Sequence, residues 1–162
     1  MPNSAENQPS LENIAKKLLA ECRHGVLSTH SNAVEGYPFG SRVPYALDQQ
    51  GRVIILISQL AQHTQNIQAN KRVSLTLWQT THEQQDIQQQ PRLVYLADAE
   101  PLPEDEENAF SLYFQAYPDT QDYYQNLDFA FYRLKPIKLH LVAGFSQVKW
   151  LNTELLFNKK SS

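Results

Sequence analysis

Apolar and polar residues alternate along much of this chain, and a period of two is the pattern of half-buried β-strands. Residues 71–79 and 137–143 show the alternation most clearly. Residues 53–57 are instead an unbroken apolar run, which is typical of a strand covered on both faces. The pattern predicts strands over residues 25–31, 38–45, 52–58, 71–79, 92–99, 128–135 and 137–143, with Pro136 between the last two.

Apolar residues at helical spacing predict three helices among these strands. The first covers residues 11–22, with Ser10 as its N-cap and Gly25 ending it. A short second helix follows over residues 58–70. The third covers residues 103–117, where an acidic first turn lies at the positive end of the helix dipole.

Short strands joined by tight turns, with few helices between them, favour a mainly β fold rather than an alternating α/β sheet. We expect an antiparallel β barrel with flanking helices. Residues 10–155 would form this single domain. Residues 1–9 would be a disordered lead-in, and residues 156–162 a C-terminal tail.

The composition of the chain limits which partners we expect it to bind and in which cellular compartment we expect it. The 162 residues include 14 Lys and Arg against 17 Asp and Glu, a net charge of -3, so we expect no nucleic-acid partner. No apolar stretch reaches the ~20 residues that a membrane span needs, so we also expect no membrane partner. A single cysteine, Cys22, and a start without signal-peptide features are typical of a cytoplasmic protein.

Motifs for the common catalytic sites are absent from the sequence, including glycine-rich phosphate loops and paired cysteines. The five histidines show no metal-ligand spacing, so we expect no metal site. Ser58 follows the apolar run and begins the predicted second helix, whose first turn offers free N–H groups near His63 and Thr64. Such a helix start suits a phosphate group. The alternative is that Ser58 only caps the helix and His63 faces solvent.

Six segments in order carry a further pattern. They are Gly25-Val26-Leu27-Ser28-Thr29, residues 36–45, residues 58–75, Pro91-Arg92-Leu93 with Ala99-Glu100-Pro101, Asp128-Phe129 with Tyr132-Arg133-Leu134, and Ala143-Gly144-Phe145 with Trp150. Together they resemble the pyridoxamine 5′-phosphate oxidase-related family, and within it the haem-utilisation branch called HugZ-like. The resemblance covers nearly the whole chain.

This resemblance implies an FMN-binding split barrel that works as a homodimer, with FMN held in clefts between the subunits and a small-molecule substrate that stays unknown. Arg42 would add positive charge near the FMN phosphate. By position, the flavin ring would lie against Ser41, Arg42 and Val43, the ribityl chain against Ile57 and Ser58, and the phosphate against His63 and Thr64, while the second subunit would contribute Arg92 and Trp150. The alternatives are a surface arginine at position 92 and an aromatic of the dimer core at position 150.

The chain departs from this pattern near its end. Residues 148–150, Val-Lys-Trp, replace the Arg-x-His motif of true pyridoxamine 5′-phosphate oxidases, which argues against vitamin B6 oxidation. The main hypothesis is an FMN-dependent oxidoreductase, in which the flavin performs the electron chemistry and no catalytic side chain is required. The alternatives are a haem-binding or haem-degrading protein with His30, His63 or His82 as axial ligand, and a binding module without a cofactor.

Overall fold

The computed structural model describes residues 9–80 and 86–157. Most of the predicted lead-in and tail, and the middle of the glutamine-rich loop, lie outside the described residues. The helices are α1 (Leu11–Glu21), α2 (Gln62–Ala69), α3 (Glu107–Ala116) and α4 (Gln121–Asn126). The strands are β1 (His24–His30), β2 (Pro38–Pro44), β3 (Ala46–Leu47), β4 (Val53–Ser58), β5 (Arg72–Trp78), β6 (Arg92–Pro101), β7 (Phe129–Val142) and β8 (Val148–Leu151).

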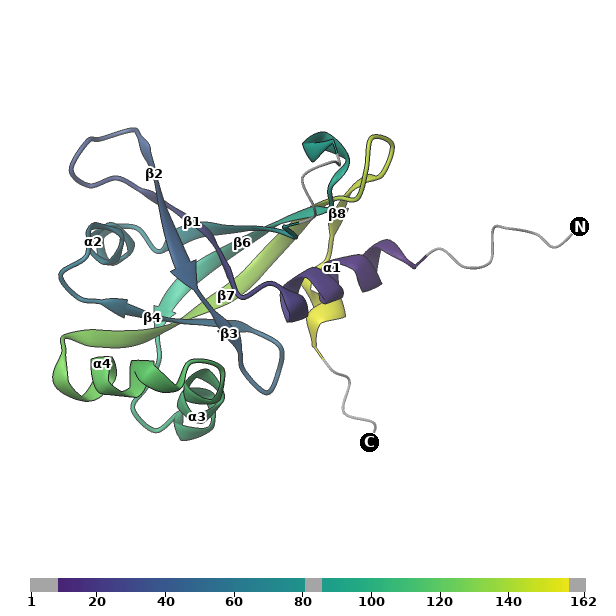
Figure 1. The fold of residues 1–162 in the computed structure, drawn as a ribbon. Helices are drawn as coiled ribbons and strands as arrows, with labels where there is room; N and C mark the ends of the chain where they lie inside the picture. The colour runs from purple at the N-terminus through teal and green to yellow at the C-terminus, as the bar shows by residue number, and fades with distance from the viewer. Residues whose placement is uncertain (1–8, 81–85, 158–162) are drawn as a thin grey trace, which may run out of the picture.

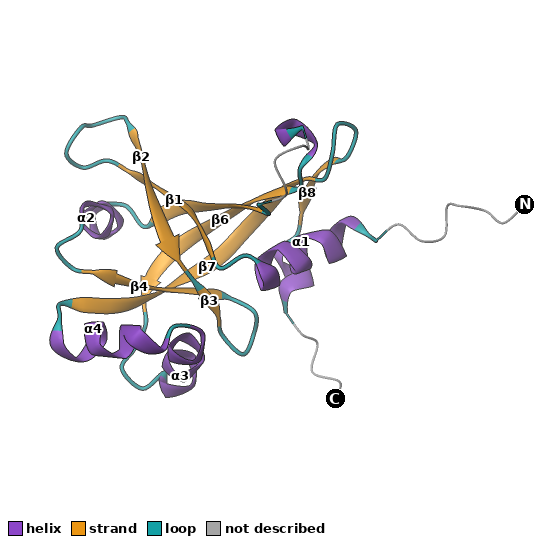
Figure 2. Ribbon diagram, viewed as in Figure 1, coloured by secondary structure: helices purple, strands orange, loops and turns teal. Residues whose placement is uncertain are grey.

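The eight strands of the described residues form one antiparallel sheet; seven follow the order β2-β1-β5-β6-β7-β4-β3, and β8 pairs with β7 outside this order. The long strand β7 pairs with β6 along one edge, while its other edge is shared by β4 and β8. The sheet twists and curls into a half-barrel, with α1 at one end and α3 and α4 packed together at the other (Figures 1 and 2). This is the mainly β, antiparallel fold with flanking helices that the sequence predicts. No helix in the described part is long and apolar enough to cross a membrane.

Two hydrophobic clusters lie on opposite faces of β4. Val53, Ile55 and Ile57 point into the larger cluster inside the half-barrel. Ile54 and Leu56 point the other way, into an aromatic cluster under α3. Both faces of β4 are therefore covered, which explains the unbroken apolar run and confirms its interpretation as a doubly buried strand.

The prediction that Gly25 ends the first helix is wrong. The α1 helix ends at Glu21 with Cys22 as its C-cap, while Ser10 caps its start through a hydrogen bond from the Asn13 N–H, as expected. Gly25 lies inside β1, where a Cβ atom would be 2.6 Å from the Leu77 side chain and 2.7 Å from a backbone oxygen of β5. Glycine is required there by close packing of two strands rather than by a helix stop.

Pro136 does not separate two strands. It lies within β7, opposite a shift in register between Leu96 and Ala97 of β6. Proline has no N–H to donate to the ladder, and a bulge is one of the places where a sheet tolerates that loss. Pro44, by contrast, lies on the edge strand β2, where the sequence placed it.

The close approach at Gly25 makes a testable prediction for stability. Gly25→Ala forces its new methyl group against β5 and should lower the free energy of unfolding by about 2 kcal/mol through overpacking. The matched control is Gly40→Ala on β2, where the new Cβ would be 3.4 Å from the Val26 side chain. Chemical denaturation measures both variants, and equal stabilities would contradict the steric account.

Candidate functional site

The face of the sheet opposite the core carries rows of side chains in cross-strand register. Inward positions such as Leu27, Leu75 and Tyr95 are fully buried, so their neighbours along each strand point outward. One outward row crosses six strands in the order Arg42, Val26, Thr76, Val94, His140 and Trp150. Arg42 and Trp150, both predicted site residues, thus share a face but lie five strand spacings apart, about 24 Å along the curled sheet.

The next row is hollow because its side chains are small. Gly40 pairs with Ser28, Ser28 with Ser74, and Ser74 with Leu96. A groove of about 550 Å³ opens over these positions. Its lining residues are Ser28, Thr29, His30, Pro38, Arg72, Val73, Ser74, Leu96, Ala97, Asp98 and Ile137. We call it the sheet groove.

The sheet groove combines an apolar wall with two polar groups at one end. Leu96 and Ile137 are half-buried and exposed, respectively, and provide apolar surface. His30 ends β1 and Arg72 begins β5, and both side chains are exposed. The carboxylate of Asp98 pairs with Lys71 at 3.7 Å, which offsets its negative charge.

Buried hydrogen bonds hold the chain on either side of His30. The Asn66 side chain on α2 is fully buried, and its Nδ2 donates to the Thr29 hydroxyl at 2.9 Å. Its Oδ1 accepts from the Asn32 N–H at 3.0 Å and from Gln62 Nε2 at 2.9 Å. This network ties α2 to the end of β1 and to the loop that follows, so the backbone at His30 is fixed.

The turn between β4 and α2 differs from the expected phosphate cradle. The second helix begins at Gln62 with Ala61 as its N-cap, so it does not start at Ser58. Ser58 instead accepts at its hydroxyl from the Leu60 N–H and at its carbonyl from the Thr64 hydroxyl, the latter at 2.6 Å. The Ser58 side chain therefore organises a turn ahead of the helix, and the prediction that it caps the helix is wrong.

Two more residues of this predicted site have side chains committed to the interior. Thr64 is fully buried, and Ile57 belongs to the core of the half-barrel. The groups at this turn that remain available are the backbone N–H groups of Gln62 and His63, for which no backbone acceptor exists within the described residues.

His63 is half-buried on α2. Its Nε2 atom is closed to solvent and has no hydrogen-bond partner in the described part of the protein. Burial lowers the pKa of the imidazole below its ordinary value, so the ring stays neutral near pH 7. One interpretation of the sequence placed the His63 side chain in solvent, and the structure contradicts it.

The other predicted site residues divide between the two faces of the sheet. Val43 is buried in the core and Ser41 points to the same side, half-buried. Arg92 is exposed at the start of β6, between its strand partners Trp78 and Val142. Only backbone atoms of residues 41 and 43 can therefore reach a ligand on the outer face, while the side chains of Arg42, Arg92 and Trp150 can.

Trp150 is exposed on β8, a strand that the sequence did not predict. Its indole lies edge-on to the His140 ring, with 4.7 Å between the ring centroids. The half-buried His140 and the exposed Trp150 form an aromatic pair at the end of the outward row, and neither lines the sheet groove.

Residues 6–158 match the family described as CREG, beta-barrel, and the chain belongs to this family. It is 32% identical over 120 residues to the non-canonical heme oxygenase HOZ, chloroplastic, of Arabidopsis thaliana. That match covers 74% of this chain but 36% of the relative, so the chain spans about a third of that protein's length.

Three solved structures with the same fold can be compared with this chain, and the names of two of them refer to haem. A heme binding protein from Mycobacterium smegmatis superposes with a TM-score of 0.82 at 24% identity, covering 93% of this chain and 61% of that one. HutZ, the heme storage protein from Vibrio cholerae, gives 0.67 at 26% identity, covering 81% and 94%. Campylobacter jejuni ChuZ gives 0.78 at 20% identity, covering 97% and 68%. These likenesses confirm the split barrel.

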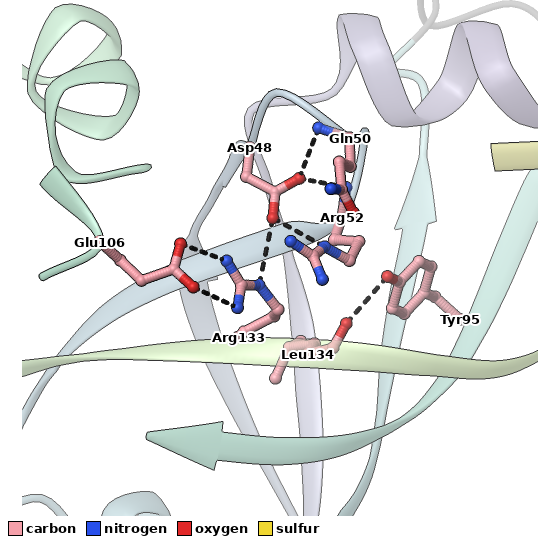
Figure 3. Close-up of polar contacts among 7 residues, drawn as sticks. All are labelled: Asp48, Gln50, Arg52, Tyr95, Glu106, Arg133 and Leu134. Carbon is pink, nitrogen blue, oxygen red and sulfur yellow. Dashed lines mark hydrogen bonds and ion pairs between the residues drawn. The ribbon is translucent and has the colours of Figure 1, made fainter. Parts of the chain in front are cut away.

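A second polar cluster, which the sequence did not reveal, joins the turn after β3 to β7 and to the start of α3 (Figure 3). The fully buried carboxylate of Asp48 accepts from the N–H groups of Gln50 and Arg52 and from the Nε atoms of Arg52 and Arg133. Arg133 also donates through both terminal nitrogens to Glu106, at 3.1 and 2.9 Å.

The charged side chains of this cluster take one another as hydrogen-bond partners. Both Asp48 oxygens accept two hydrogen bonds each, and the guanidinium fork of Arg133 is matched by the Glu106 carboxylate. Nearby, the buried Tyr95 hydroxyl donates to the Leu134 carbonyl (Figure 3). With its donors and acceptors satisfied internally, the cluster is a structural clamp between the half-barrel and α3.

The clamp gives a pH dependence with a defined sign. Hydrogen bonding to Arg133 lowers the pKa of the Glu106 carboxyl below its ordinary value, so the pair stabilises the fold above the unfolded pKa and is lost as the pH falls through the folded one. We expect Glu106→Gln to reduce the free energy of unfolding by about 1 kcal/mol near pH 7, and by less as the pH falls below about 4.

Urea denaturation across this pH range measures the effect, and the exposed neighbour Glu104→Gln serves as the control. A difference between Glu106→Gln and the unaltered chain that persists unchanged in acid would contradict the ion-pair account.

Proposed function

We propose that this protein binds haem in the sheet groove, with His30 as the axial ligand. The observation that carries the proposal is the composition of that groove: an apolar wall, one exposed imidazole, one exposed guanidinium, and a carboxylate, that of Asp98, which is paired with Lys71. Its volume of about 550 Å³ lies within the range of cofactor sites. The haem-related names of the relatives support haem as the ligand.

The residues present fit the chemistry of the group. Leu96 and Ile137 offer apolar surface to a macrocycle, and histidine is a common axial ligand of haem iron. Arg72 offers a guanidinium for a carboxylate such as a propionate. Haem, when bound, supplies redox and oxygen chemistry, while the chain provides the ligand, the apolar wall and the charge.

His30 suits the ligand role better than the other histidines named from the sequence. Its side chain is exposed at the groove, and the Asn66 network holds the backbone on both sides of it. His63 has its Nε2 closed off by protein and does not line the groove. His82 lies outside the described residues.

We further propose that the functional unit is a homodimer in which a second copy covers this outer face. Large apolar side chains are exposed on this face: Ile137 (53%) in the groove, and Trp78 (43%), Val148 (56%) and Trp150 (55%) beyond it. Several large apolar side chains exposed on one face are typical of an interaction site. In such a dimer Trp150 of one subunit would approach the site on the other, as the resemblance to FMN-binding split barrels implies.

FMN is the second candidate cofactor, with the chain acting as an FMN-dependent oxidoreductase. The specific observation in its favour is the pair of available N–H groups of Gln62 and His63 at the start of α2. Ser58 and Thr64 hold the preceding turn rigidly through the hydroxyl-to-carbonyl bond between them. FMN would use this turn for its phosphate, whereas haem would use the sheet groove.

Titration of the purified protein with haem, followed by the Soret band, tests the main proposal. The unaltered chain should bind haem with one saturable site per chain. His30→Ala should raise the Kd by about tenfold or more, because the iron loses its protein ligand. His63→Ala is the matched control, and it should keep the original spectrum and affinity.

The same pair of variants separates the alternatives. Loss of haem binding in His63→Ala but not in His30→Ala would overturn the groove assignment. A flavin spectrum on purification, with FMN binding weakened by His63→Ala, would favour the second candidate. Binding of neither cofactor would leave only the module without a cofactor.

A further inference from the structure

A cationic groove lies at the opposite end of β1 from His30. It has a volume of about 450 Å³ and is lined by Arg23, His24, Arg42, Pro44 and Tyr117. We infer that this cationic groove binds a phosphomonoester, with the two guanidinium groups as its ligands. The site is separate from the proposed haem groove, since β1 has seven residues and its ends are about 20 Å apart.

Arg23 is held in place by the end of α3. Its Nη2 donates to the Ala116 carbonyl at 2.6 Å, and the guanidinium lies 5.0 Å from the centre of the Tyr117 ring. The Tyr117 hydroxyl in turn donates to the Tyr45 carbonyl at 2.8 Å and contacts the carbonyl of Arg23 itself. The guanidinium is therefore oriented before any ligand arrives, which reduces the entropy lost on binding.

Arg42 is held by a histidine. Its Nη2 lies 3.1 Å from Nε2 of His24, the outward residue at the start of β1. A guanidinium can only donate, so this imidazole nitrogen accepts the bond. His24 thereby fixes the direction of the Arg42 side chain while leaving its other N–H donors available.

Neither arginine of this groove forms an ion pair with a carboxylate among the described residues, although Glu21 lines an adjoining hollow that shares Arg23 and His24. Over residues 9–80 and 86–157, the ion pairs involve Asp48, Glu106, Asp98, Glu21 and Glu12 as acceptors, and none of them includes Arg23 or Arg42. The lining contains no acidic residue. A chain with a net charge of -3 thus keeps two oriented guanidinium groups together without a counter-ion.

Two guanidinium forks match a phosphate better than a carboxylate. A phosphomonoester dianion has three terminal oxygens and two charges, so it can accept from both arginines at once. A single carboxylate has two oxygens, which one fork already satisfies. The apolar edges of Pro44 and Tyr117 leave room beside the phosphate for the organic part of a small ester.

Isothermal titration calorimetry with glycerol 3-phosphate, at constant low ionic strength, tests the inference. The unaltered protein should show one saturable site. Arg42→Gln should raise the Kd by about tenfold or more, and Arg23→Lys, which keeps the charge but loses the planar fork, should raise it less. Lys16→Gln, an exposed cation on α1 outside the groove, is the charge-matched control and should leave the Kd unchanged.

Far-UV circular dichroism of each variant checks that the fold is intact. Absence of saturable binding in the unaltered protein, or equal affinities for Arg42→Gln and Lys16→Gln, would overturn the inference. Binding to vesicles that contain phosphatidic acid, without binding of the soluble ester, would overturn its small-molecule part. Because His30 is not in this groove, His30→Ala should bind the ester normally even if it no longer binds haem.

Discussion

The register of the antiparallel sheet is the constraint on which the rest of this molecule depends. Side chains alternate between the two faces of each strand, so Leu27, Leu75 and Tyr95 can form one layer of the core only if their neighbours form a layer outside. A slip of one residue would exchange the faces of a strand. Burial of the core therefore aligns the small residues Ser28 and Ser74 outside it, and the sheet groove follows from that alignment.

Most strands were predictable because their period-two pattern is local. The errors arose where a residue has more than one structural use. Gly25 is typical of a helix end, yet here it permits close packing of β1 on β5. Pro136 is typical of a strand end, yet a bulge accommodates it within β7. The start of α2 was placed too early because Ser58 resembles an N-cap, whereas its hydroxyl and carbonyl organise a separate turn.

The candidate site was harder to predict than the fold, because it joins residues that are far apart in sequence. His30 could be named as a possible ligand, but nothing local indicated that Arg72 and Leu96 would lie beside it. The Asp48 clamp has the same origin, since Arg133 is 85 residues away along the chain. The sequence does contain one feature that indicates the groove: small residues occupy outward positions on strands that turn out to be neighbours. Locating it requires the strand order, which the pattern does not contain.

The split barrel of the CREG β-barrel family forms the outer face of the sheet. The side chains that line the sheet groove are the basis of the haem proposal. The most direct test is an anomalous difference map at the iron absorption edge, from crystals of the haem-loaded protein. The account predicts an iron peak over the Ser28 and Ser74 row, bonded to the imidazole of His30. A peak at the β4–α2 turn, or one bonded to His63 or His140, would contradict it.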